Sequence, residues 1–176
     1  MKLVHLKDMT PDLWYHAWNA MFDPFLGDHM GVNPQLIAAK PSIEDFYRNV
    51  LAAHEAERLE AWAIVRDGKF VGYTTLDKSV GEWENATVLA DPKLWGSGMG
   101  VYATFHAFHW AFEVDGAEWV VAFTQGKDPR VARMHEKINY RRLMNFWVLD
   151  RGTWEADLRA KYERLKRRYE EIPDGS

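Results

Sequence analysis

The sequence predicts a single α/β domain with a mixed central sheet, flanking helices and a further helix at its C-terminal end. Short β-rich apolar runs alternate with longer segments whose apolar residues recur at helical spacing. Two of these runs flank Asp67-Gly68, a strong hairpin signal, so part of the sheet is antiparallel. Gly96, Gly98 and Gly100 lie at a junction between a predicted strand and a predicted helix, so strands and helices alternate in this half of the chain.

Each predicted element rests on a local signal. Thr10-Pro11-Asp12 supplies a cap, a first-turn proline and a first-turn acid for the first helix. Asp-Pro, glycine and Asn-Pro positions after Phe22 predict a long loop, and Ser42 with Asp45 predicts the next helix start. In chain order we expect a strand at 2–6, helix at 10–22, loop at 23–41, helix at 42–59, hairpin at 61–77, strand at 86–90, helix at 98–114, strand at 118–124, helix at 129–137, strand at 140–149 and helix at 153–171.

Composition narrows the class of protein. The chain has 176 residues, 47% hydrophobic and 27% charged, without repeats or low-complexity linkers, as a globular domain has. The absence of cysteine removes disulfides and thiolate chemistry and fits a reducing compartment, so we expect a cytoplasmic protein. No apolar run approaches the ~20 residues that cross a bilayer, and the charged N-terminus argues against a signal peptide. A net charge of −4 argues against a general nucleic-acid binder.

The glycine segment, residues 96–100, lies where backbone N–H groups and the helix dipole attract an anion, and phosphate is the natural ligand. A Walker loop is excluded because no Gly-Lys-Ser/Thr follows. The pattern Gly98, Gly100, Ala103 fits a dinucleotide fingerprint, yet the next strand ends in residues 123–125, Phe-Thr-Gln, rather than in an acid. A glycine-rich turn that only allows close packing is the structural alternative.

Two blocks resemble the GCN5-related N-acetyltransferase (GNAT) superfamily. Residues 89–103, LADPKLWGSGMGVYA, are similar to its acyl-CoA signature, a strand and Asp-Pro followed by a Q/R-x-x-G-x-G/A loop that opens a helix. Residues 128–142, DPRVARMHEKINYRR, are similar to its N-x-x-A-x-x-x-Y-x-x-x-G-F segment. The resemblance covers residues 1–149. It implies a GNAT-like sheet with two splayed parallel strands and an acyl-CoA-binding domain over residues 1–150.

The resemblance implies acetyl-CoA or another acyl-CoA as the cofactor. Pantetheine would pair with a strand backbone in the gap between the splayed strands, and residues 96–101 would hold the pyrophosphate through N–H groups. A backbone N–H near Leu89 or Ala90 would polarise the thioester carbonyl. The expected cofactor-binding residues are Val88, Leu89, Ala90, Trp95, Gly96, Ser97, Gly98, Met99, Gly100, Val101 and Asp128.

Four positions depart from the family pattern. Trp95 replaces the usual Gln or Arg, which removes one side-chain contact to the pyrophosphate. Asp128 replaces Asn and adds a negative charge near the cofactor channel. Asn139 replaces Gly, which is tolerated because Asn also adopts the left-handed conformation. His135 stands where the family often has a tyrosine that protonates the leaving thiolate, so His135 is the expected catalytic acid.

The implied reaction is direct attack of an amine on the acyl-CoA in a ternary complex, the amine belonging to a small molecule or a protein. Because an aliphatic amine has a pKa of about 10.4, a base must remove a proton. Glu84 is the candidate base, with Glu82 behind it, and a solvated strand-end charge is an equal alternative for either. Aromatic residues expected around the acceptor or in the core are Trp14, Trp18, Phe22, Phe25, Tyr73 and Trp83.

Other interpretations stay open at this point. Trp95 and Asp128 also fit a non-catalytic acyl-CoA-binding or interaction protein, and the acidic charge disfavours a GNAT-fold protein that acts on nucleic acid. No metal site is expected, since His106 and His109 share a helix face without a third ligand nearby in the sequence. Residues 151–176 should form an amphipathic helix and tail that pack either on the domain itself or on a partner subunit. In the second case the protein would be a homodimer.

Overall fold

The computed structural model describes residues 1–78, 81–123, 129–143 and 146–170. These residues form one mixed sheet with the strand order β1-β2-β3-β4-β5-β7-β6. The strands are β1 (Lys2–His5), β2 (Leu59–Arg66), β3 (Lys69–Asp77), β4 (Trp83–Leu89), β5 (Trp119–Phe123), β6 (Arg141–Leu143) and β7 (Phe146–Asp150). Neighbouring strands are antiparallel except β4 and β5, which are parallel. The predicted fold class is confirmed.

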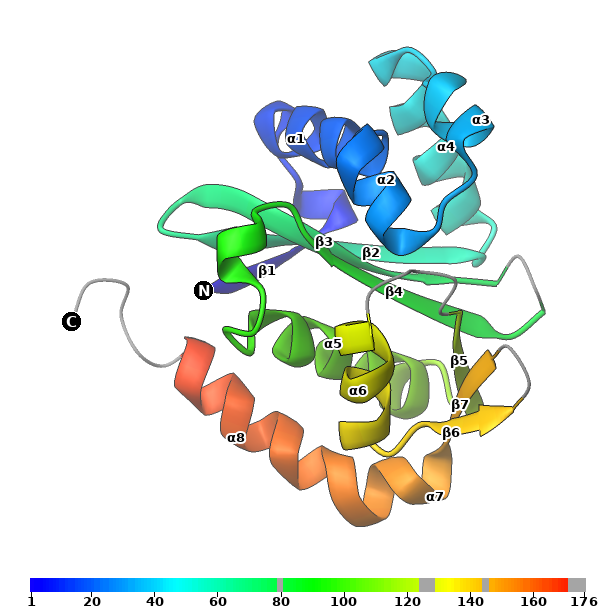
Figure 1. Cartoon of the computed structure of the whole chain (residues 1–176), viewed down its shortest axis with the longest axis vertical. Helices are drawn as coiled ribbons and strands as arrows, with labels where there is room; N and C mark the ends of the chain where they lie inside the picture. Colours follow the sequence, from blue (N-terminus) through cyan, green and yellow to red (C-terminus); the bar gives the residue numbers. More distant parts are fainter. Residues whose placement is uncertain (79–80, 124–128, 144–145, 171–176) are drawn as a thin grey trace.

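Helices cover both faces of the sheet (Figure 1). The first face carries α1 (Pro11–Met21), α2 (Pro24–Met30), α3 (Pro34–Ala38) and α4 (Ile43–Glu55). The second carries α5 (Met99–His109) and α8 (Arg159–Glu170), with α6 (Pro129–Lys137) beside α5. Short helical turns complete the described chain: η1 (Leu6–Asp8), η2 (Pro92–Leu94), η3 (Trp110–Val114), α7 (Arg151–Thr153) and η4 (Trp154–Leu158). None of the described helices combines the length and apolarity needed to cross a membrane.

Several local predictions are confirmed by backbone geometry. The Thr10 hydroxyl accepts a hydrogen bond from the Leu13 N–H at 3.3 Å, and Ser42 accepts one from the Asp45 N–H at 3.1 Å, so both helix starts are capped as expected. Asp67 and Gly68 have φ values of 51° and 73°, the left-handed pair that a tight hairpin turn needs.

Other predictions are wrong for identifiable reasons. The expected loop at 23–41 contains α2 and α3, because Asp23 and Asn33 accept hydrogen bonds from nearby N–H groups as helix caps and the prolines that follow occupy the first helical position. The helix expected at 42–59 ends at Glu55, and Leu59 already belongs to β2. The expected single strand at 140–149 is two antiparallel strands, β6 and β7.

Strands β4 and β5 separate soon after they meet. Among the described residues their register comprises only Trp83 with Val120 and Glu84 with Val121. The rest of β4 continues to Leu89 while still paired with β3 on its other side. Beyond Glu84 the side of β4 that faces β5 is therefore unpaired among the described residues, as expected of splayed parallel strands. We call this unpaired side of β4 the gap.

The C-terminal helical segment shares the main core with α5. Trp154, Leu158 and Tyr162 are at most 1% exposed. The Tyr162 ring stacks on Tyr102 of α5 with 6.0 Å between centroids. Leu165 and Tyr169, the remaining members of the predicted apolar stripe, pack against the same cluster. The segment is therefore covered by the domain itself, and α8 runs alongside α5 (Figure 1).

Candidate active site

The glycine loop turns the chain from β4 into α5. Gly96 and Gly98 have φ values of 83° and 87°, and Gly98 is the residue that caps α5. A side chain at Gly98 would be strained by this conformation and would place its Cβ 3.0 Å from the Tyr169 hydroxyl. The first-turn N–H groups of α5 have no partner within the helix. One of them, that of Met99, donates to the Ser97 hydroxyl at 3.3 Å. The loop thus has the local structure of an anion site.

The end of α8 holds this loop from behind. The Tyr169 hydroxyl donates to the Ser97 carbonyl at 3.0 Å. Next to it, the Tyr102 hydroxyl in the first turn of α5 donates to Glu170 Oε1 at 2.5 Å. Sequence reasoning placed Tyr169 only in an apolar stripe and did not connect Glu170 to the loop, since about 70 residues separate these partners. No spacing pattern could have revealed this contact.

Leu89 presents its peptide groups to the gap. The Ala90 N–H donates to the Val71 carbonyl of the neighbouring strand β3 at 2.9 Å. Since alternate residues of a strand direct their peptide groups to opposite sides, those of Leu89 point away from β3. Of the two N–H groups expected near a thioester carbonyl, that of Ala90 is therefore already bonded within the sheet, and that of Leu89 faces the gap.

Trp95 turns toward this strand end and toward α2. Its indole N–H donates to the Leu89 carbonyl at 3.0 Å. Its ring stacks on His29 with 4.3 Å between centroids and lies 6.3 Å from the Phe25 ring. Trp95, which replaces the family's usual Gln or Arg, therefore uses the Leu89 carbonyl, a hydrogen-bond acceptor that faces the gap.

A group of titratable side chains lies where β4 and β5 separate. Burial and the neighbouring charge of Asp77 raise the pKa of Glu84. Burial, with the Glu84 charge as a second cause, raises the pKa of Tyr140 well above its usual value, and the Tyr140 hydroxyl has no hydrogen-bond partner among the described residues. His135 is 6% exposed, its ring lying 5.0 Å from that of Tyr140. Burial lowers the pKa of His135 to about 4, so its imidazole is neutral at pH 7.

An apolar cavity of about 410 Å³ lies on the first face of the sheet, under α1, α2 and α3. Tyr73 of β3 lines it and pairs with Val88 of β4, so the cavity adjoins the strand that borders the gap. None of its lining side chains carries a charge: they are Ala20, Met21, Phe22, Leu26, Gly27, Met30, Val32, Leu36, Ile37, Ala39 and Tyr73. Of the aromatic residues expected around the acceptor, Phe22 and Tyr73 line this cavity, whereas Trp14 and Trp83 are core residues.

The remaining candidates have clear positions. Met99 is a core residue that is 2% exposed in total, and Asp128 lies outside the described residues. His106 Nδ1 is hydrogen-bonded to the Tyr162 hydroxyl at 3.0 Å, and the His109 ring stacks on Tyr162 at 5.0 Å. These two histidines therefore bind the last helix to α5.

Known proteins share this fold. Residues 8–141 match the family described as the acetyltransferase (GNAT) domain. Aminoglycoside acetyltransferase AAC(6')-Ib in complex with coenzyme A superposes with a TM-score of 0.67 at 13% identity, over 89% of this chain and 99% of that chain. Spermidine N-acetyltransferase from Vibrio cholerae, in complex with CoA and spermine, gives a TM-score of 0.68 at 9% identity, over 84% and 94%. No curated protein matches the chain by sequence.

The chain belongs to the acetyltransferase (GNAT) domain family, because the match spans most of its length. The resemblance noted in the sequence is confirmed. The two structural neighbours share the fold at 13% and 9% identity. The CoA and spermine in their structures are ligands of those two proteins.

The burial of His135 predicts a pH-dependent stability. Its pKa of about 4 in the folded chain is below the usual 6.5, so between these values the unfolded chain binds a proton that the folded chain does not. Stability therefore falls as the pH drops through this window. From pH 7 to pH 5 the wild type should lose about 2 kcal/mol more than His135→Phe. Urea unfolding at both pH values measures the difference.

The exposed His16 provides the matched control. His16→Phe should keep the wild-type loss on acidification. An equal loss in His135→Phe and the wild type would show that His135 takes up a proton in the folded chain as readily as in the unfolded one.

Proposed function

We propose that this protein is an N-acyltransferase that moves an acetyl group from acetyl-CoA, or a related acyl group from another acyl-CoA, to an amine. The observation that supports it most is the continuity of the gap beside β4 with the glycine loop at the start of α5. An extended ligand with an anionic end fits this arrangement, since peptide groups border the gap and helical N–H groups stand at its end. CoA is such a ligand, since its pantetheine arm is extended and its pyrophosphate is anionic.

The thioester would lie beside Leu89 in this proposal. A peptide N–H that faces the developing negative charge is worth ~3–4 kcal/mol of barrier when it is preorganised. The Leu89 N–H faces the gap, whereas the Ala90 N–H is engaged with Val71. Trp95 already binds the Leu89 carbonyl, so pantetheine must displace the indole there or pair around it.

Glu84 is the proposed base for the acceptor amine. Its raised pKa makes the Glu84 carboxylate a stronger base than an ordinary glutamate. It can therefore accept the proton that the amine loses as it attacks the acyl group. Glu84 and Val88 lie on the same face of β4, and their separation of four residues is about 13 Å along the strand. The proton therefore travels to Glu84 through water.

The thiolate that leaves needs a proton in return. His135 is the donor that the family position suggests, but its neutral imidazole at pH 7 holds no readily released proton. The adjacent Tyr140 hydroxyl carries a proton at pH 7 and has no hydrogen-bond partner among the described residues, so Tyr140 is the second candidate donor. Burial and the Glu84 charge raise its pKa, which makes it a weaker acid than a free tyrosine. Full kcat in Tyr140→Phe would exclude this role.

The glycine loop gives the first test of cofactor binding. Gly98→Ala forces a left-handed alanine against Tyr169, which should tilt the loop and weaken CoA binding at least tenfold, about 1.4 kcal/mol. Titration calorimetry with CoA measures this directly. Gly116→Ala is the matched control, because Gly116 has a similar φ of 78° with open space around it and lies away from the loop. Equal affinity in both variants and the wild type would place the cofactor elsewhere.

The base is tested by an isosteric change. Glu84→Gln removes the carboxylate and should lower kcat about 100-fold, the lower end of acid–base contributions, with little change in the Kd for CoA. In the wild type, activity should fall as the pH drops through the raised pKa of Glu84, since only the carboxylate accepts the proton, and this acidic limb should be absent from the variant. Glu82→Gln, at an exposed neighbour, should behave as the wild type. A large loss in Glu82→Gln alone would transfer the role to Glu82.

We further propose that the acceptor is an amine with an apolar alkyl or aryl body, which fills the uncharged cavity under α1, α2 and α3. Multiply charged amines need carboxylates to replace their hydration, and the lining offers none. Among assayed amines, arylalkyl amines should therefore have at least tenfold higher kcat/KM than spermine or kanamycin, a difference of about 1.4 kcal/mol. Thiol release from acetyl-CoA measures the rates.

A cavity-filling variant separates acceptor binding from cofactor binding. Ile37→Trp should raise the acceptor KM without changing the Kd for CoA, because Ile37 lines the cavity. Gln35→Trp, exposed on the same helix, should leave both constants unchanged. CoA binding without turnover of any amine would instead support the non-catalytic acyl-CoA-binding alternative.

A further inference from the structure

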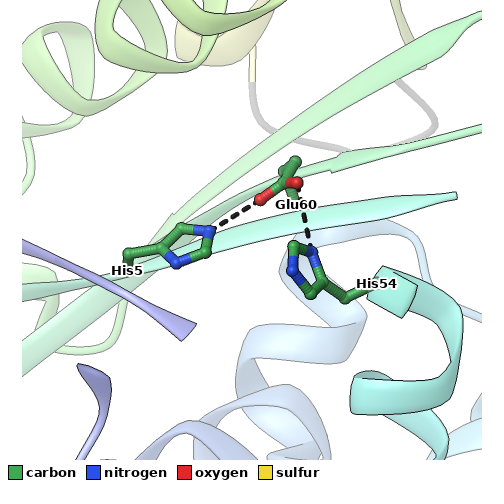
Figure 2. Close-up of side chains that lie close together, drawn as sticks. All are labelled: His5, His54 and Glu60. Atoms are coloured by element: carbon green, nitrogen blue, oxygen red, sulfur yellow. Dashed lines mark hydrogen bonds and ion pairs between the residues drawn. The ribbon is translucent and has the colours of Figure 1, made fainter. Parts of the chain in front are cut away.

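Three side chains from separate elements meet at the β1 edge of the sheet (Figure 2). His5 ends β1, His54 lies in the last turn of α4, and Glu60 is the second residue of β2. His5 Nε2 lies 2.7 Å from Glu60 Oε2, and His54 Nδ1 lies 3.1 Å from Glu60 Oε1. Figure 2 shows both imidazoles directed at the one carboxylate. Glu60 is only 7% exposed, so these two rings are its main polar surroundings.

This cluster is separate from the glycine loop. Glu60 pairs with Leu76 of β3, which pairs with Asn85 near the start of β4. The glycine loop follows Leu89, at the other end of β4. No metal site was expected from the sequence, since His106 and His109 lacked a third ligand nearby. His5, His54 and Glu60 are far apart along the chain and show no ligand spacing, so no sequence pattern indicated this cluster.

We propose that His5, His54 and Glu60 bind a divalent transition-metal ion, with Zn²⁺ as the best match. Their candidate ligand atoms all lie within 4.8 Å of one another. Tetrahedral zinc with bonds of 2.0–2.2 Å holds its ligands about 3.3 Å apart, so small outward rotations of the side chains suffice. Two imidazole nitrogens select zinc and its neighbours over Mg²⁺ and Ca²⁺, which prefer oxygen alone.

The hydrogen bonds of the metal-free cluster define what the ion replaces. The Lys7 N–H donates to His5 Nδ1 at 3.4 Å, so the ring hydrogen of neutral His5 is on Nε2, facing Glu60. His54 Nδ1 likewise donates to the Leu59 carbonyl at 3.1 Å. When the ion binds, it is held by His5 Nε2 and His54 Nδ1, the two nitrogens next to Glu60. Each neutral ring then carries its hydrogen on its other nitrogen, His5 on Nδ1 and His54 on Nε2. The long Lys7 contact and the Leu59 contact are lost, which lowers the affinity of the site.

The surroundings leave room for a solvent ligand. The His5 side chain is 25% exposed, which gives water a path to the fourth coordination position. On the inner side the His5 ring contacts Trp62, with 5.7 Å between centroids. Three protein ligands and one water make a site that ties the edge strand β1 to α4 and β2. Its role is structural, since it joins three elements of the fold and lies toward the opposite end of β4 from the glycine loop.

Metal titration of the full, tag-free chain after chelator treatment tests the site. Zinc calorimetry should give one ion per chain, and Co²⁺ should give the strong visible absorption of four- or five-coordination. His54→Ala and Glu60→Gln should each weaken Zn²⁺ binding at least tenfold, about 1.4 kcal/mol. The partly exposed His5→Ala, checked by circular dichroism, covers the case in which a buried substitution disturbs folding. Excess Zn²⁺ should raise the Tm of the wild type but not of His5→Ala.

His16→Ala is the matched control, since His16 is an exposed histidine on α1 beside Asp12. It should bind Zn²⁺ and Co²⁺ as the wild type does. The proposal is overturned if the wild type binds less than one ion per chain, if Co²⁺ shows only weak octahedral absorption, or if His16→Ala weakens binding as much as His54→Ala. Each of these results would identify the cluster as a metal-free hydrogen-bonded network.

Discussion

The structure depends on the point at which β4 stops pairing with β5. A strand inside a sheet normally satisfies its N–H and C=O groups on both sides, and leaving them unpaired in a buried position is costly. Here β4 keeps β3 along its length and loses β5 after Glu84. An edge is thereby created in the middle of the sheet, where a ligand can complete the pairing. Tyr140 lies close enough to Glu84 for that charge to contribute to its raised pKa, and its ring lies 5.0 Å from that of His135.

The glycine loop and the last helix form the other half of this arrangement. The left-handed Gly98 turns the chain so that α5 begins at the end of the gap. Tyr169 then holds the Ser97 carbonyl, which fixes the orientation of the peptide whose N–H belongs to Gly98. The apolar stripe of the C-terminal segment supplies the packing that places Tyr169 there, since Trp154, Leu158 and Tyr162 are buried on α5. A segment outside the region matched by the family therefore supports the part of the fold that the family defines.

Signals confined to a few residues were readable from the sequence, and contacts between distant segments were not. Capping by Thr10 and Ser42, the Asp67-Gly68 turn and the glycine loop depend on neighbouring residues, so they could be predicted. The same kind of local signal gave a wrong prediction at Asp23-Pro24 and Asn33-Pro34. Both pairs were interpreted as loop signals, whereas in the structure each begins a helix. Which peptide groups of β4 face the gap follows from its register with β3, and the contact of Tyr169 with Ser97 follows from the tertiary packing of α8. Neither leaves a pattern in the sequence.

Trp95 shows that a substitution in a family motif can add new contacts to the site as well as remove an old one. Measured against the family pattern, this position lacks a polar side chain for the pyrophosphate. In the structure its indole N–H donates to the Leu89 carbonyl and its ring stacks on His29 of α2. Trp95 also packs against the buried cluster that contains Leu26, Tyr73 and Val88, beside the apolar cavity. A ligand group that donates to the Leu89 carbonyl gains one hydrogen bond only by breaking the bond to Trp95, so the net gain at that carbonyl is small. In the proposed complex, displacement of Trp95 would also break its stacking contact with His29 of α2. Trp95 therefore contacts both the strand that we propose to bind the cofactor and the helix beside the proposed acceptor cavity.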